Sequence, residues 1–288
     1  MIYPFIGYRS WEHDPVLGRP KTLKVCDMDY SGTKTYAFNT LGFRGEEYDP
    51  DAGMRIFFSG CSYTFGTGLN YEETAAYKFK MLYCREFGID PLTVNLLNFA
   101  MPGASNDYIV RTIISQCQRV KPDIAVVLFS HIDRAEYIDE EALGERVWTV
   151  GPWWIGDEVY DHLKPPVAEV KERIEVIRDA SIGYFHYSTP ANASARFLQN
   201  ALLLQYYFER NNIPFVLHWV EFNQFEYLQH HFALSVIAEL LQKEHFIDYS
   251  DPAKYWCDKA ADKAHPGPLS NANIASALFK TYKKLYAS

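Results

Sequence analysis

The chain has 288 residues, of which 48% are hydrophobic, 16% aromatic and 22% charged, a composition typical of a folded soluble protein. Its 28 basic and 36 acidic residues give a formal charge of −8 without a Lys/Arg cluster, which argues against a nucleic-acid partner because such proteins need a basic surface. The first residues do not resemble a secretion signal, no run is apolar enough for a membrane span, and the five cysteines are scattered, so we expect a cytoplasmic protein with reduced thiols and no membrane partner.

The first half of the chain predicts strands that alternate with helices. Residues 1–50 are rich in Gly, Pro, Asp and Tyr and predict loops with a small hairpin. A strand is expected from Met54 to a turn at Ser59-Gly60, and a helix over 72–87. Further strands are expected over 94–99 and 124–129, on either side of a helix over 106–120.

Residues 134–190 interrupt this alternation and predict an aromatic-rich insertion with one helix near 167–178. The alternation then returns with a helix over 193–210, a strand over 215–219, a helix over 232–243, a short apolar piece at 246–247 and a final helix over 271–286. Such alternation predicts one α/β domain over 1–288, with a doubly wound, mostly parallel sheet and helices on both faces.

A first motif, Gly60-Cys61-Ser62-Tyr63-Thr64-Phe65-Gly66, directly follows the first predicted strand of the sheet. A serine between a strand and a helix is exposed at the edge of the sheet, where backbone N–H groups can stabilise a developing negative charge. Ser62 is therefore a candidate nucleophile, and a Gly/Ser turn without chemistry is the alternative. A Cys61 thiolate is a weaker candidate, because adjacent residues point in different directions and only one can face a given base.

Two further motifs accompany it. Residues 98–106, Asn-Phe-Ala-Met-Pro-Gly-Ala-Ser-Asn, follow the second strand and read most simply as a turn before a helix capped by Ser105. Asp262-Lys263-Ala264-His265-Pro266-Gly267 precedes the last helix. A local turn there can aim the Asp262 carboxylate at His265, fixing the tautomer while the other ring nitrogen takes the serine proton. Asp258 is a second candidate for this orienting role, and a surface turn with a solvated histidine is the alternative.

In these motifs the chain resembles the SGNH/GDSL hydrolases. The family's first block is Gly-Asp-Ser-x-Thr-x-Gly, here with Cys61 in place of the aspartate, and its last block is Asp-x-x-His-Pro. Its second block has a glycine at the position of Gly103, whose N–H binds the oxyanion. The resemblance covers mainly residues 54–133 and 193–286, residues 39–45 also look like a lead-in seen in some relatives, and the implied fold is a flavodoxin-like three-layer sandwich.

The family's third block, Gly-x-Asn-Asp, is missing. Its asparagine contributes to the oxyanion hole, and here that position falls on Ile132, within Ser130-His131-Ile132-Asp133-Arg134. Either His131 donates instead, or Asn106 reaches in from the second motif, or the hole has only two donors. His131 and Arg134 could equally be structural.

The resemblance implies a serine hydrolase, an esterase or deacetylase for a small or carbohydrate O-acyl ester, with acyl transfer to a sugar hydroxyl as a variant. Ser62, His265 and Asp262 would form the triad. A non-catalytic binding protein with the same cleft is the alternative. No HExxH, P-loop or GxGxxG motif occurs, and His230 and His231 diverge on a helix, so no cofactor or metal is expected. The insertion's aromatic side chains could cover the cleft for a sugar ring or form a packing layer, and the oligomeric state stays open.

Overall fold

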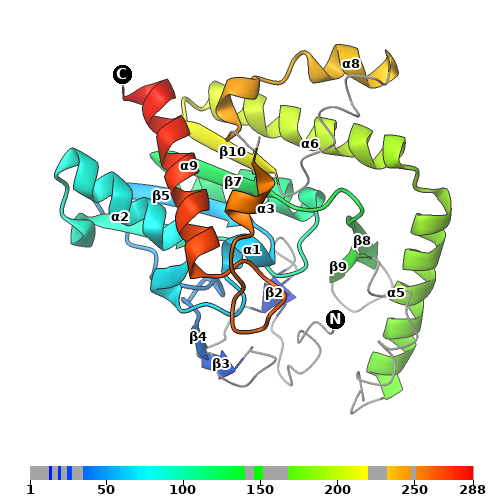
Figure 1. Cartoon of the computed structure of the whole chain (residues 1–288). Helices are drawn as coiled ribbons and strands as arrows, with labels where there is room; N and C mark the ends of the chain where they lie inside the picture. The colour runs from blue at the N-terminus through cyan, green and yellow to red at the C-terminus, as the bar shows by residue number, and fades with distance from the viewer. Residues whose placement is uncertain are drawn as a thin grey trace.

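The centre of the molecule is a parallel sheet whose four strands are buried from end to end or nearly so (Figure 1). The computed structural model describes residues 13–14, 19–20, 25–27, 35–139, 146–151, 168–219, 232–247 and 251–287. The strands are β5 (Met54–Gly60), β6 (Val94–Asn98), β7 (Ile124–Phe129) and β10 (Phe215–Trp219), in the order β6-β5-β7-β10. Each neighbouring pair is parallel. Phe246 extends the sheet beyond β10 by a single parallel bridge to Leu217.

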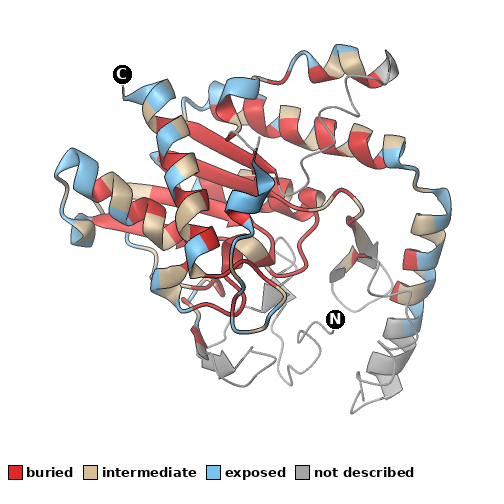
Figure 2. Cartoon of the chain, viewed as in Figure 1, coloured by how far each residue is buried: buried red, intermediate tan, exposed pale blue. Residues whose placement is uncertain are grey.

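Helices cover both faces of this sheet, as Figure 1 shows. On one face, α3 (Asn106–Val120) and α6 (Pro190–Arg210) pack over a cluster that includes Phe57. On the other face, α2 (Ala75–Phe87) and α9 (Pro268–Tyr286) pack over a cluster that includes Phe58. Neighbouring strand residues point to opposite faces, so a strand covered on both sides is apolar throughout. Figure 2 shows the buried residues concentrated in the strands and on the inner sides of these helices.

The doubly wound, mostly parallel sheet predicted from the sequence is confirmed. β5, the first strand of the sheet in chain order, lies between the second strand, β6, and the third, β7, which is the flavodoxin-like order. In open sheets of this kind, ligands bind beyond the carboxyl ends of the strands where the strand order reverses. The segments that follow β5, β6 and β7 therefore occupy the position at which a site is expected.

Two predicted helices are shorter in the structure. The helix expected over 72–87 begins at Ala75, because Thr74 is extended and its hydroxyl accepts the N–H of Tyr77 as an N-cap. The helix expected over 232–243 ends earlier, as α8 (Phe232–Ala238). Gln205 of α6 bonds the backbone just beyond it, accepting the N–H of Gln242 and donating to the carbonyl of Leu240. These bonds fix a non-helical backbone there.

The segment between β7 and α6 contains more regular structure than the sequence predicted. β8 (Ala135–Asp139) and β9 (Arg146–Val150) form an antiparallel hairpin, and α5 (Ala168–Tyr187) is a twenty-residue helix. Of the aromatic residues of this insertion, Tyr184, Phe185 and Tyr187 lie on α5, whereas Trp153, Trp154 and Tyr160 lie outside the described residues, as does the pair His230-His231.

The predicted N-terminal hairpin corresponds to β3 (Val25–Asp27), which pairs antiparallel with β4 (Thr35–Ala37). β1 (His13–Asp14) and β2 (Arg19–Pro20) form another antiparallel pair. In the part of the chain that the structure describes, no helix is long and apolar enough to cross a membrane.

Candidate active site

Ser62 lies where β5 ends and the short helix α1 (Ser62–Phe65) begins, as expected. The exposure expected from the sequence is wrong, because the residue is 1% exposed. The first motif has a steric reason for its glycine. A Cβ on Gly60 would lie 2.0 Å from the Thr64 hydroxyl oxygen and 2.7 Å from the carbonyl oxygen of Leu128. Only glycine allows α1 to fold back this closely onto the end of β5, which places Ser62 at the carboxyl edge of the sheet.

Arg44 holds the other end of α1. Its guanidinium donates to the backbone carbonyls of Phe65, Gly66 and Leu69, each at 2.7 Å, and lies 4.4 Å from the centre of the Tyr36 ring. Burial lowers the pKa of Arg44 to about 10, which leaves it protonated at neutral pH. A buried cation at the C-terminal end of a helix stabilises its carbonyl groups. Arg44 thereby fixes the backbone that follows Ser62.

The second motif is attached to the same strand end. The backbone N–H of Phe99 donates to the carbonyl of Phe58 at 2.7 Å, and that of Met101 donates to the carbonyl of Gly60 at 3.1 Å. Gly103 follows in this turn with a φ of 79°, a conformation that other residues rarely adopt. The structure therefore brings Gly103 into the turn beside the residues that lead to Ser62.

The third motif forms a compact loop in which Asp262 contacts the ring of His265. One carboxylate oxygen accepts the backbone N–H groups of Ala264 and His265, both at 3.1 Å, and the other contacts Nδ1 of the imidazole. The two side chains are 1% and 5% exposed, Asp262 first. The loop is closed by the N–H of Ala260, which donates to the carbonyl of His265 at 2.9 Å. This contact assigns the donor role to Nδ1 and leaves Nε2 as the nitrogen that can accept a proton.

The same contacts set the protonation state of Asp262. Burial by itself raises the pKa of this carboxyl, but the hydrogen bond and charge of His265 and the N–H groups of Ala264 and His265 outweigh burial. The net pKa lies below the ordinary value for an aspartate. Asp262 is therefore ionised at neutral pH, the state that a group orienting an imidazole requires.

Asp258, the second candidate for orienting His265, has a different role in the structure. Its carboxylate accepts the backbone N–H groups of Leu269 and Ser270 at 2.9 and 2.7 Å, and the Ser270 hydroxyl at 2.6 Å. These are the first turns of α9, whose N–H groups have no partners within the helix. Asp258 therefore anchors the N-terminus of α9.

Two contacts bring the serine turn and the histidine loop together. The backbone N–H of Ala261 donates to the carbonyl of Gly68 at 3.2 Å, which joins the loops directly. The ring of Tyr63, the residue after Ser62, lies 5.6 Å from the ring of His265 at an angle of 81°. First and third motifs, about 200 residues apart in the chain, thus meet at one edge of the sheet.

At the end of β7, the position of the missing asparagine is part of the core. Ile132 is 9% exposed and belongs to the cluster under α3 and α6. Asn106 is bonded at both ends of its amide, accepting the N–H of Ser130 at 2.7 Å and donating to the carbonyl of Ser130 at 3.2 Å. Arg134 donates to the Ser130 hydroxyl at 2.8 Å. These bonds give Asn106 and Arg134 a part in fixing the backbone after β7.

His131 points to a different neighbour, because its ring lies 6.1 Å from the ring of Tyr63 at 77°. Cys61, by contrast, is fully buried in the core cluster that contains Phe57 and Phe99. The Cys61 side chain therefore has a packing role in the core. Among the described residues, no group of three His, Cys, Asp or Glu side chains is arranged to hold a metal ion.

Sequence reasoning did not single out three residues near Ser62: Arg44, Tyr63 and Trp256. An arginine in the otherwise apolar and glycine-rich stretch 41–45 was a usable signal for burial. Trp256 has no such signal, yet its ring lies 5.3 Å from Tyr63. Its position depends on the path of the chain between β10 and α9.

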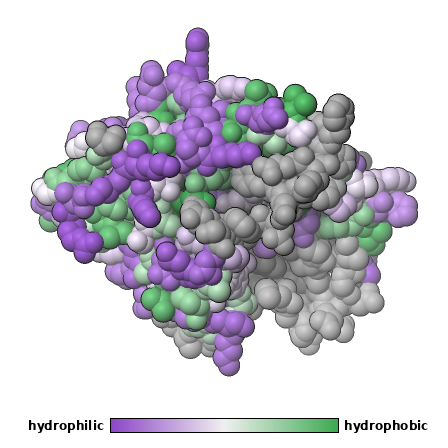
Figure 3. Space-filling model, turned by 45° about the horizontal axis from the view of Figure 1, so that its top comes forward, coloured by the Kyte–Doolittle hydropathy of each residue, from purple (hydrophilic) through white to green (hydrophobic). Residues whose placement is uncertain are grey.

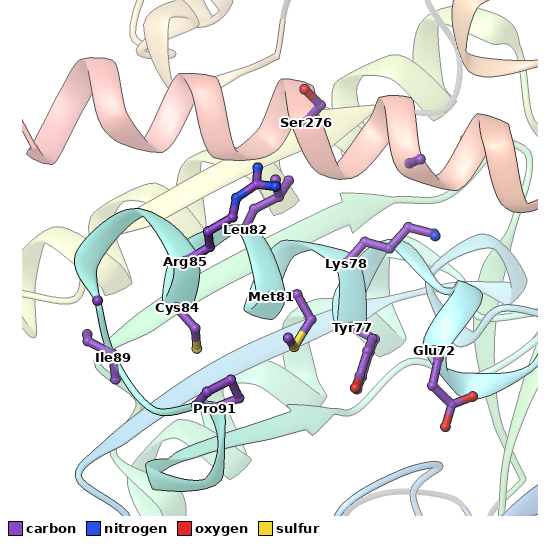
Figure 4. Close-up of a pocket in the computed structure, with 12 residues that line it drawn as sticks. Glu72, Tyr77, Lys78, Met81, Leu82, Cys84, Arg85, Ile89, Pro91 and Ser276 are labelled. Carbon is purple, nitrogen blue, oxygen red and sulfur yellow. The ribbon is translucent and has the colours of Figure 1, made fainter.

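A separate pocket of about 750 Å³ lies between α2 and α9, where Arg85 and Leu82 point from α2 toward α9 (Figure 4). No residue of the three motifs lines it, so the pocket lies apart from the candidate site.

On the face seen in Figure 3, hydrophobic surface of the described residues occurs as small pieces among hydrophilic side chains.

Comparison with known proteins gives weak likenesses. No family model matches the sequence, and no curated protein matches it. Among solved structures, TesA has a TM-score of 0.47 and 12% identity, covering 81% of this chain and 99% of TesA. The esterase EstA from Pseudoalteromonas sp. has a TM-score of 0.46 and 13% identity, with 81% and 99% covered. The acetyl xylan esterase AlAXEase has a TM-score of 0.41 and 11% identity, with 79% and 98% covered.

Proposed function

We propose that this protein is a serine hydrolase of the SGNH/GDSL type that cleaves O-acyl esters. The observation that supports this most strongly is the buried contact between Asp262 and His265 in a loop joined to the turn of Ser62. A buried carboxylate is costly unless it is bonded, and an imidazole that a carboxylate orients can activate a serine hydroxyl within its reach. A binding protein has no need of this combination.

In the proposed reaction, the Ser62 hydroxyl attacks the ester carbonyl while Nε2 of His265 takes its proton. Asp262 keeps Nδ1 protonated and stabilises the imidazolium that forms. The C–O bond to the alcohol then breaks, and the alcohol leaves with the proton from Nε2. Water attacks the acyl-enzyme by the same route and releases the acid; a sugar hydroxyl in place of water would give acyl transfer.

The negative charge on the carbonyl oxygen needs hydrogen-bond donors. We assign two of them to the backbone N–H groups of Ser62 and Gly103, which follow the adjacent strands β5 and β6. His131 is our candidate for the third donor, because Asn106 is already engaged with Ser130 at both ends of its amide. Each such donor contributes on the order of 10²–10³ in rate in serine hydrolases.

Turnover of p-nitrophenyl acetate by the purified protein tests this proposal, together with Ser62→Ala and His265→Ala. We expect the parent to turn over and both variants to fall to background, a loss of about 10³-fold or more. Cys61→Ala is the matched control, since it removes the neighbouring thiol and should keep most of the activity. A fluorophosphonate probe should label the parent and the Cys61→Ala variant but not Ser62→Ala.

Equal background in the parent and all variants, with no fluorophosphonate labelling of Ser62, would contradict the hydrolase. That result would favour the alternative, a protein that retains the cleft and binds its ligand without chemistry.

A further inference from the structure

Trp256 occupies a position beside the candidate site that packing alone does not require. It follows a 3-10 turn, Pro252–Tyr255, and its side chain belongs to none of the buried core clusters of the described residues. The residue is 39% exposed. Large apolar side chains are stabilised by burial, so an aromatic residue left partly open at the edge of a site is a candidate for ligand contact.

The contacts of Tyr63 relate Trp256 to the reacting groups. The Tyr63 ring lies 5.3 Å from Trp256, 5.6 Å from His265 and 6.1 Å from His131, in each case at between 77° and 81°. Edge-to-face contacts of this kind are specific in geometry. Tyr63 therefore fixes the indole in orientation while part of it stays open to solvent.

The reaction determines which part of a substrate would meet this indole. The leaving alcohol must take its proton from Nε2 of His265, so the alcohol portion of an ester lies against His265. Trp256 shares the segment before α9 with His265 and contacts the same tyrosine. The alcohol portion, rather than the acyl group, is thus the part within its reach.

The surroundings of Trp256 favour a sugar over a long aliphatic chain. Lys254 and Lys259 are exposed near it in the chain, as are the small apolar residues Pro252 and Ala253. The indole packs into none of the apolar clusters of the described residues, so it is an isolated apolar face. A pyranose ring has one apolar C–H face and a rim of hydroxyl groups, which matches such a surface. An aliphatic alcohol would instead need a continuous apolar wall.

We propose that Trp256 is a specificity-determining residue, which stacks on the sugar ring of an O-acetylated carbohydrate while Tyr63 holds it in place. The inference rests on the proposed ester hydrolysis and names the substrate class of that site. It predicts that Trp256 contributes to reactions of acetylated sugars and not to those of small alkyl acetates, because the acetyl group is the same in both.

The test compares kcat/KM for glucose pentaacetate and for ethyl acetate in the parent, Trp256→Phe and Trp256→Ala. For Trp256→Ala we expect a fall of about tenfold or more on the sugar ester, mainly in KM, with ethyl acetate changed less than about threefold. Trp256→Phe should retain part of the preference. Tyr206→Ala, which removes an exposed aromatic side chain from α6, is the control and should leave the ratio unchanged.

An unchanged ratio in Trp256→Ala would overturn the inference, and so would equal losses on both esters, which indicate a merely structural role. Binding separates this question from catalysis. Titration of Ser62→Ala with xylotriose should quench tryptophan fluorescence, and the added Trp256→Phe change should abolish the quenching. If the parent hydrolyses no ester but this quenching is observed, the hydrolase proposal fails while the sugar contact stands; absence of the quenching counts against the contact itself.

Discussion

The ends of β5 and β7 lie side by side in the sheet, but their polar side chains are used differently. After β5, side chains elsewhere in the fold secure the backbone: Arg44 takes the carbonyls at the end of α1 and leaves the Ser62 hydroxyl out of this network. After β7, the amide of Asn106 bonds the backbone of Ser130, and Arg134 donates to the Ser130 hydroxyl. At the end of β7 the polar side chains therefore have a structural role, whereas at the end of β5 the serine hydroxyl stays outside such a network, which is where we propose the chemistry takes place.

This difference explains how the fold accommodates the missing third motif. The backbone after β7 still needs partners for its N–H and carbonyl groups, and Asn106 supplies them from the first turn of α3. Its amide is then committed to Ser130. An oxyanion donor from this strand must come from another residue, which is why we assign the role to His131.

The largest effect is expected from breaking the contact between Asp262 and His265, the pair proposed to activate Ser62 at the end of β5. Asp262→Asn should lower kcat about 10³- to 10⁴-fold, because an amide no longer holds Nδ1 as the protonated nitrogen. Asp258→Asn is the matched control, and it should cost about 1 kcal/mol of unfolding free energy through the weakened cap of α9 while leaving kcat nearly unchanged. Steady-state kinetics and urea denaturation of both variants provide the check; a larger kcat loss in Asp258→Asn would reverse the assignment.

His131 tests whether the end of β7 has any catalytic part. We expect His131→Ala to lower kcat about 10²-fold, as loss of one oxyanion donor does, with little change in the urea midpoint. His131→Asn should retain more activity, because an amide can donate from the same position. If alanine and asparagine variants keep full kcat, the oxyanion hole has two donors and His131 is not one of them.

Asn106 should show the opposite behaviour. Asn106→Leu leaves the N–H and carbonyl of Ser130 without their side-chain partner, so we expect a loss of about 1–3 kcal/mol of unfolding free energy. At low temperature, where the variant stays folded, kcat should change less than that of His131→Ala. Urea denaturation and kinetics at the same temperature measure both quantities, and a large kcat loss without destabilisation would make Asn106 the third donor.

The smallest effect concerns pH. Because the pKa of Asp262 is lowered in the folded protein, its stabilising contribution is fully present above the pKa of an unfolded aspartate and is lost as the pH falls through the lower, folded value. The unfolding free energy of the parent should therefore fall more steeply on acidification below about pH 4 than that of Asp262→Asn. Parallel slopes in the two proteins would show that Asp262 is not stabilised in its ionised form.

Local patterns were sufficient to predict most of the fold. β10 and α3 have the bounds expected from their residues, as does β7, because a fully apolar run and a capped helix are decided by neighbours in sequence. Predictions failed where a distant side chain decides the backbone, as Gln205 does beyond α8. The hairpin β8–β9 was also missed, since its strands pair with each other and add nothing to the alternation of the main sheet.

The sequence by itself determined which residues we propose to carry the chemistry: Ser62 after a strand, and Asp262 three positions before His265. Such motifs are short, so the few residues between the two side chains allow only a small number of relative positions for them. Only the tertiary structure decided that Asp262 rather than Asp258 faces the imidazole, that Asn106 is bonded to Ser130, and that Trp256 meets Tyr63 edge to face. Those outcomes depend on contacts between segments far apart in the chain, which the packing of helices and loops on the sheet brings within bonding distance.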